Sequence, residues 1–131
     1  MNNASKQLLA FFNNGGNMIE TGTLLLLCHF VGDFIFQNDW IAGNKKTSNV
    51  ACLIHALTYL IPFIILNLLT PLQLLLVGGQ HFIQDRTNFV KEFMIFKGSK
   101  EFSEGIFSPW SVVVTDNILH ICWIFLVVSL I

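Results

Sequence analysis

Long apolar stretches alternate with short polar ones along the chain, and four of the apolar stretches have the length of a membrane-spanning helix. A helix needs about 17 to 25 mostly apolar residues to cross a hydrocarbon core of about 30 Å. The pattern therefore predicts an all-α fold, an integral membrane bundle of four transmembrane helices. The expected spans cover about residues 21–38, 50–69, 71–90 and 110–131.

These spans divide the chain into two parts. We expect residues 21–131 to form a single four-span helical membrane domain. Residues 1–20, MNNASKQLLAFFNNGGNMIE, contain only the short apolar run QLLAFF before an NNGG break. We expect this N-terminal segment to be either a short interfacial helix or disordered.

The composition agrees with a membrane protein. Of the 131 residues, 53% are hydrophobic and only 11% are charged, whereas about a quarter of the residues of a soluble domain are charged. The formal net charge of -1 lacks the basic excess that nucleic-acid binding requires. We therefore expect membrane lipid, and no nucleic acid, as a partner.

The distribution of the lysines predicts how the chain is oriented in the cell inner (cytoplasmic) membrane. The connection over residues 39–49 contains two lysines and that over residues 91–109 contains three, whereas the connection between the second and third spans has no basic residue. Basic residues concentrate in cytoplasmic connections. Both lysine-containing connections are therefore expected to be cytoplasmic, with the termini on the opposite side of this multi-pass protein.

Charged and polar residues recur inside the spans at a helical spacing. Residues four apart are neighbours on one face of a helix. Three spans contain a histidine and an aspartate at this spacing, namely His29 and Asp33, His81 and Asp85, and Asp116 and His120. The fourth span runs opposite to the first and third, so its reversed order places each aspartate nearer the cytoplasm. In the first span, Gln37 extends the predicted row by one more turn.

The same counting predicts that these side chains lie at one depth. At about 1.5 Å per residue, each of the three aspartates lies about 7 to 10 Å from the cytoplasmic edge, and its histidine partner about 6 Å deeper. His55 enters from the same side and reaches about 8 Å. The four histidines and three carboxylates are thus expected to form one polar site.

A bound cation would make such a site tolerable in a membrane. A charge near the middle of a spanning helix costs about 2.5 to 3.5 kcal/mol on insertion scales. Carboxylate and imidazole groups bind zinc, manganese, iron or nickel, and helical bundles build such sites from facing helices. We therefore predict one or two divalent metal ions. The candidate ligands are His29, Asp33, His55, His81, Asp85, Asp116 and His120.

Further side chains have candidate supporting roles. Gln37, Gln80 and Gln84 would hold ligating carboxylates by hydrogen bonds, although plain interhelical hydrogen bonds explain them equally well. An uncoordinated carboxylate, with Asp33 as the candidate, would act as the catalytic general base.

The segments HFVGDFIFQNDWIAGNKK, CLIHALTY, HFIQD and DNILH resemble a family of small bacterial and phage integral membrane proteins known as domain of unknown function 3307. The likeness covers about residues 23–125 and implies a multi-span membrane protein. More distantly, the chain is similar to membrane-bound metal-dependent hydrolases. The family resemblance implies as signature residues His29, Asp33, Gln37, Trp40, Lys45, His55, His81, Asp85, Asp116 and His120.

Three functions are compatible with these features. The first is a metal-dependent membrane hydrolase acting on a lipid or amphiphilic ester or phosphoester. The second is a proton or metal-ion transport protein, in which oligomerisation of the chain would extend the polar path. The third is a non-catalytic membrane protein that recruits a protein partner through its loops, with the polar side chains serving as interhelical contacts.

Overall fold

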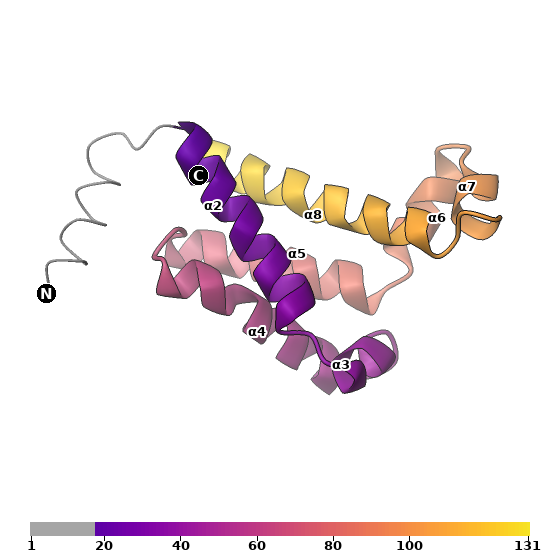
Figure 1. Cartoon of the computed structure of the whole chain (residues 1–131), viewed down its shortest axis with the longest axis horizontal. Coiled ribbons are helices and arrows are strands. Elements are labelled where there is room, and N and C mark those ends of the chain that lie inside the picture. The colour runs from indigo at the N-terminus through magenta and orange to yellow at the C-terminus, as the bar shows by residue number, and fades with distance from the viewer. Residues whose placement is uncertain (1–17) are drawn as a thin grey trace, which may run out of the picture.

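The computed structural model describes residues 18–131, and all regular structure within that range is helical (Figure 1). The predicted all-α class is therefore confirmed for these residues. Most of the predicted N-terminal segment, residues 1–17, lies outside the described part. The elements are α2 (Met18–Phe30), the π-helical turn η1 (Val31–Ile35), α3 (Asp39–Asn44), α4 (Asn49–Ile65), α5 (Pro71–Arg86), α6 (Phe89–Phe96), α7 (Lys100–Glu104) and α8 (Trp110–Leu130).

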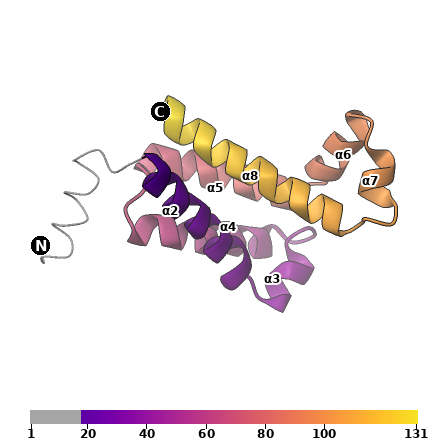
Figure 2. The same ribbon diagram turned by 45° about the horizontal axis from the view of Figure 1, so that its top comes forward.

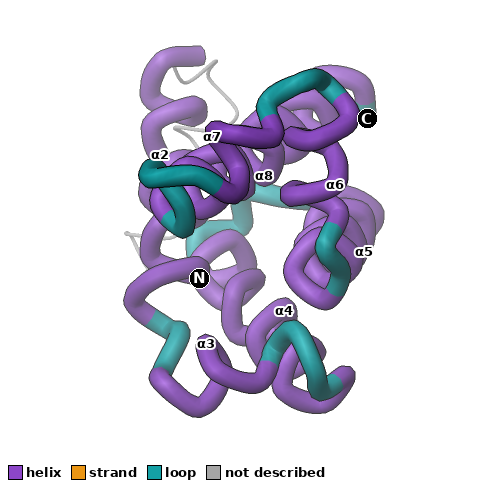
Figure 3. Tube along the Cα trace, turned by 90° about the vertical axis from the view of Figure 1, so that its right-hand side faces the viewer, coloured by secondary structure: helices purple, strands orange, loops and turns teal. Residues whose placement is uncertain are grey.

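Four long helices form an antiparallel bundle. Helix α2 contacts α4 and α8, and α5 contacts the same two helices, which closes the ring. Consecutive long helices run in opposite directions along the bundle (Figure 1). Viewed end-on, they are arranged around a common interior (Figure 3). The short helices α3, α6 and α7 lie at the same end of the bundle, with α6 beside α7 and α3 beside α4 (Figure 2). This arrangement follows from short connections, which favour antiparallel neighbours.

Local capping sets the ends of the central helices. The Ser48 side chain accepts a hydrogen bond from the backbone N–H of Ala51 at the start of α4. Thr70 forms a reciprocal capping box with Gln73 at the start of α5, and a proline in the first turn that follows loses no helical hydrogen bond. In the connection between α4 and α5, Asn67 has a φ of 51°. Asparagine adopts this left-handed conformation more readily than most residues.

The helices are shorter than the sequence predicts. The spans expected over 50–69 and 71–90 form helices of 17 and 16 residues that end at Ile65 and Arg86. The chain becomes extended at Thr87, with a ψ of 173°, which stops α5. Among the described residues only Trp110–Leu130 is long and apolar enough to cross a membrane by itself, which is a weak indication of membrane association. The four-span arrangement therefore stays a prediction.

The prediction that His29, Asp33 and Gln37 form one row on a single α-helix is wrong. The chain leaves α-helical geometry at η1, where the N–H of Phe36 bonds the carbonyl of Val31 five residues earlier. Gln37 follows the helix in an irregular segment. The wider turn changes the direction in which successive side chains point, so His29 and Asp33 contact different partners.

A glycine permits close packing at this turn. A Cβ on Gly32 would lie 2.5 Å from the carbonyl oxygen of Tyr59 and 2.9 Å from the Tyr59 ring. Backbone cannot move aside as a flexible side chain can, so only glycine fits here without displacing η1 from α4. Asp33 is the next residue, and its position therefore depends on this contact.

The apolar core fills the half of the bundle nearer the start of α2 and the end of α8. The buried residues there are Leu25, Cys28, Tyr59, Phe63, Leu69, Val77, Ile124 and Val127. Toward α3 and α6, the interior contains the buried histidines and aspartates beside apolar residues such as Ala51, Cys52 and Met94. The bundle interior thus has an apolar and an ionisable segment.

The Gly32 contact predicts that alanine substitution destabilises the protein at Gly32 but not at Gly79. Gly32→Ala should lower the free energy of unfolding by about 1 to 3 kcal/mol, the usual effect of overpacking. Gly79→Ala is the matched control, since a Cβ there meets nothing within 4 Å and alanine favours a helix by about 0.5 to 1 kcal/mol. Thermal unfolding followed by circular dichroism in detergent measures both. Equal stability of the two variants would contradict the assigned role of Gly32.

Candidate metal centre

Six of the predicted ligands come together between the helices. Asp33 comes from η1, His55 from α4, and two residues each from α5 and α8, namely His81 with Asp85 and Asp116 with His120. Five of these side chains are buried, and Asp116 is half-buried. Residues as far apart in the sequence as Asp33 and His120 thus contribute to one cluster.

Four atoms of this cluster lie close enough together to hold one metal ion. We define the four-ligand group as Asp33, His55, His81 and Asp85, each of which offers one atom to a common centre. His55 Nε2 lies 3.1 Å from Asp33 Oδ1, 3.1 Å from Asp85 Oδ2 and 3.2 Å from His81 Nε2. His81 Nε2 lies 3.7 Å and 3.6 Å from the same two carboxylate oxygens. Ligands about 2.0 to 2.1 Å from a tetrahedral zinc ion are about 3.3 to 3.4 Å apart.

Without an ion, these atoms depend on a few shared protons and on the Lys45 ammonium, 2.8 Å from Asp85 Oδ2 and 3.4 Å from His55 Nε2. A hydrogen bond between the two Nε2 atoms needs one nitrogen to donate and the other to accept. The accepting nitrogen then turns a lone pair toward carboxylate oxygens. The Nδ1 atoms of His55 and His81 are buried without a hydrogen-bond partner among the described residues. A divalent cation at the common centre would attract all four ligand atoms at once, so the donor set fits a metal ion.

A second group adjoins the first. Asp33, Asp116 and His120 also offer atoms close enough to hold an ion. Asp33 belongs to both groups, and His120 Nε2 lies 3.3 Å from Asp85 Oδ1. A shared carboxylate between neighbouring ligand sets is typical of two-metal centres. The cluster can therefore accommodate one ion or two.

A glutamine relay fixes the orientation of His120. Asp116 accepts a 2.8 Å hydrogen bond from the Gln84 side-chain amide, and Gln84 in turn accepts one from Gln80. Gln80 must then use its oxygen toward His120 Nδ1, 3.1 Å away. His120 Nδ1 therefore donates to Gln80, and Nε2 faces the carboxylate oxygens of Asp85 and Asp116 at 3.3 and 3.5 Å. Gln80 and Gln84 thus occupy the positions that the sequence suggests for hydrogen-bonding support.

The structure does not bring two of the predicted residues into the ligand groups. Both ring nitrogens of His29 have other partners, the Tyr59 hydroxyl at 3.0 Å and Asn117 Oδ1 at 2.9 Å. Gln37 makes no hydrogen bond to a carboxylate within the described chain, and its buried Oε1 has no partner there. The π-helical turn between these two residues accounts for the difference, because it interrupts the row that an α-helix would have produced.

Two residues contact the cluster although the spacing of histidines and aspartates does not predict them. The Tyr59 ring stacks on His81 with centroids 3.7 Å apart and holds the plane of the imidazole. Lys45 reaches into the cluster, with Nζ 2.8 Å from Asp85 Oδ2 and 3.4 Å from His55 Nε2. Tyr59 lies four residues after His55, a spacing that could have indicated it. Lys45 belongs to the signature residues, but its position in a predicted connection points to solvent.

Comparison with known proteins identifies a family. Residues 22–131 match the family model described as "Protein of unknown function (DUF3307)". The chain belongs to this family. No curated protein and no solved structure matches the chain, so the more distant likeness to membrane-bound hydrolases gains no support from them. The family description names no activity, so only the side chains of the cluster indicate a chemical function.

The Lys45 ion pair predicts a stability change that depends on metal. In metal-free protein Lys45 is the cation next to Asp85, so Lys45→Met should lower the free energy of unfolding by about 3 kcal/mol. With zinc bound, the loss should be smaller because Asp85 then has another cation. Lys46→Met is the control, since its ammonium bonds two backbone carbonyls. Unfolding in EDTA and in zinc measures both, and an equal Lys45→Met effect in the two solutions would contradict this role.

Proposed function

We propose that this protein is an integral membrane hydrolase with one or two divalent metal ions, acting on a lipid or amphiphilic ester or phosphoester. The single observation that carries the proposal is the four-ligand group, whose nitrogen and oxygen atoms all lie within 4.8 Å of one another, with His55 Nε2 3.1 to 3.2 Å from the other three. Manganese, iron and nickel accept the same ligand types. Zinc is favoured because its sites are commonly four-coordinate.

The surface of the bundle supports a membrane environment. Each long helix turns large apolar side chains outward, as at Leu27, Leu57, Leu75 and Ile118, all more than half exposed. The same helices bury histidines and aspartates. Soluble proteins rarely expose apolar area this continuously, whereas a lipid-facing exterior explains it. We therefore propose four spans, in which α2 with η1, α4 and α5 cross near the lower limit of length.

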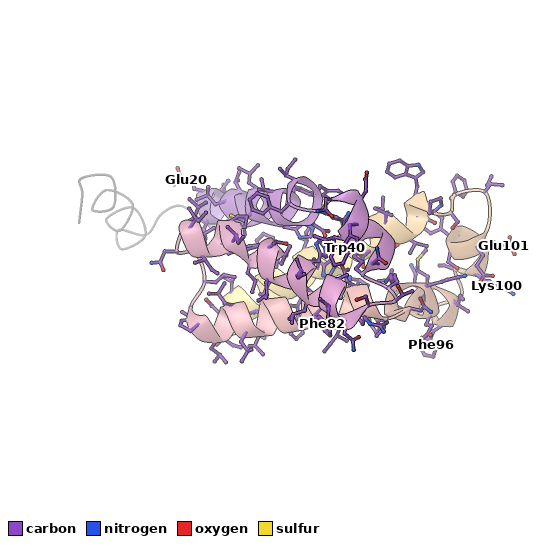
Figure 4. All side chains as sticks on the ribbon, turned by 90° about the horizontal axis from the view of Figure 1, so that it is seen from below. Glu20, Trp40, Phe82, Phe96, Lys100 and Glu101 are labelled. Carbon is purple, nitrogen blue, oxygen red and sulfur yellow. The ribbon has the colours of Figure 1, made fainter. Side chains whose placement is uncertain are left out.

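Aromatic residues support an interface at the α3 and α6 end. Trp40 and Trp110 are 51% and 75% exposed, and tryptophan prefers the boundary between lipid and water. Phe96 lies with Lys100 and Glu101 at the end of the molecule opposite Glu20 (Figure 4). We propose that this end is cytoplasmic, with connections 39–49 and 91–109, and that the termini lie on the other side.

The proposed chemistry assigns a task to each part of the cluster. A divalent ion bound there supplies Lewis-acid chemistry, polarising an ester or phosphoryl oxygen and making a water molecule more acidic. His55, His81 and Asp85 hold the ion. Asp33, common to both ligand groups, would help to hold the ion or would accept the proton of the attacking water as general base. The surrounding helices exclude bulk water.

Metal content tests the proposal most directly. Wild-type protein purified in detergent should contain at least about one zinc or other transition metal per chain. His55→Gln and His81→Gln should each lower the metal affinity about 100-fold or more, since each removes a ligand. His29→Gln is the matched control and should retain the metal, because both His29 nitrogens bond elsewhere. Inductively coupled plasma mass spectrometry measures all four proteins.

The outcomes separate the candidate functions. Loss of metal in His29→Gln but not in His55→Gln would overturn the assignment of ligands. A metal-loaded protein that hydrolyses neither ester nor phosphoester lipids in vesicles would favour metal-ion transport over hydrolysis. A folded protein that binds no metal would refute the metal centre.

Reporter fusions test the proposed topology. Alkaline phosphatase should be active when fused after residue 131 or after residue 68, because both points are predicted to lie outside the cytoplasm. The same reporter should be inactive after residue 47, where a green fluorescent protein fusion should fluoresce instead. Activity of alkaline phosphatase after residue 47 would show the reverse orientation, and activity at all three points would contradict a four-span protein.

A further inference from the structure

A cavity lies beside the metal centre at the end of the bundle that carries α3 and α6. Its volume is about 240 Å³, several times the roughly 30 Å³ that one water molecule occupies in the liquid. Three valines form one part of its wall. The polar side chains that line it are Lys45, Lys46, Asn88, Lys91, Asp85 and Asp116.

The lysines of this cavity differ in how well their charge is balanced. Lys46 Nζ bonds only backbone carbonyls, those of Thr87 at 2.7 Å and Gln84 at 3.4 Å. Neutral carbonyls orient the ammonium but leave its charge available. Lys91 pairs with Glu104 at 3.1 Å, and both side chains are more than a third exposed, so water weakens that pair.

Metal binding would change the balance further. Lys45 is paired with Asp85, a member of the four-ligand group. A divalent ion held by Asp33 and Asp85 would neutralise both carboxylates, which would leave the Lys45 charge uncompensated. Asp116 then remains as the one carboxylate facing three ammonium groups in the cavity. The loaded site would therefore attract an anion directly beside the metal.

We infer that this cavity binds the phosphate group of the substrate, with Lys46 and Lys91 as its anion-binding residues. The inference rests on the proposed function and narrows its substrate class to phosphoesters. Lysine is a common phosphate ligand because its ammonium is a compact charge with three donors.

An adjoining groove accounts for the apolar part of such a substrate. Val113 borders both the lysine cavity and a second, almost wholly apolar groove of about 360 Å³. Phe30, Phe34, Trp110 and Ile118 also line this groove. A phosphate in the cavity and a hydrocarbon chain in the groove would belong to one amphiphilic molecule. The arrangement favours a lipid phosphoester over a free phosphate metabolite.

Phosphate binding by lysine variants tests the inference. Full-length protein in phosphatidylcholine nanodiscs would be supplied with zinc and titrated with inorganic phosphate, and, in parallel discs, with phosphatidic acid. Lys46→Met and Lys91→Met should each weaken binding about tenfold, as expected for loss of one charged hydrogen bond. The matched control is Lys97→Met, which removes an exposed lysine outside the cavity and should change the affinity less than about twofold.

The outcomes are distinguishable from failure of the metal centre. Zinc content is measured on the same samples and should be equal in wild type and the lysine variants. If Lys46→Met and Lys91→Met bind both probes as tightly as wild type, or if Lys97→Met is weakened equally, the anion site is refuted whatever the zinc content. Tighter binding of phosphatidic acid than of inorganic phosphate assigns the site to a lipid headgroup. Equal binding assigns it to a soluble phosphoester.

Discussion

The interior of this bundle depends on how three carboxylates are neutralised inside it. Asp33 and Asp85 are buried and Asp116 is half-buried, and an unpaired charge in such surroundings is strongly unfavourable. Lys45 is the lysine that reaches them, through Asp85. The histidines surround the carboxylates with nitrogen atoms at 3.1 to 3.7 Å, which is the arrangement of a coordination sphere. The interior therefore combines a buried cluster of ionisable side chains with a separate apolar core.

Packing around the cluster gives it rigidity. Tyr59 holds the ring plane of His81 by stacking and donates or accepts a hydrogen bond at His29. The same residue meets Gly32 through its backbone, so one tyrosine connects α4 to η1, to α2 and to the cluster residue His81. The glutamine relay fixes the proton of His120. Ligands held in this way need little rearrangement on binding an ion, which favours affinity.

The sequence predicts the helices and most of the cluster, for identifiable reasons. Four-residue spacing survives in α5 and α8, where His81 with Asp85 and Asp116 with His120 share a helix face. It fails between His29 and Gln37, where the chain forms a π-helical turn whose Gly32 packs against Tyr59, a tertiary contact that four-residue spacing does not reveal. Hydropathy likewise overestimates the lengths of α4 and α5, since apolar residues continue past the caps that end these helices.

Lys45 is the residue whose role the sequence conceals most completely. A lysine in a polar connection is ordinarily a solvated charge, and the positive-inside tendency uses it as such. Its stem is long enough to bring the ammonium to Asp85 while most of the side chain crosses apolar surface, and its side chain is only 17% exposed. A metal ion bound there would compete with this lysine for the Asp85 carboxylate. Metal loading would turn the ammonium from a structural counter-ion into a charge facing the adjoining cavity, which couples the metal centre to anion binding.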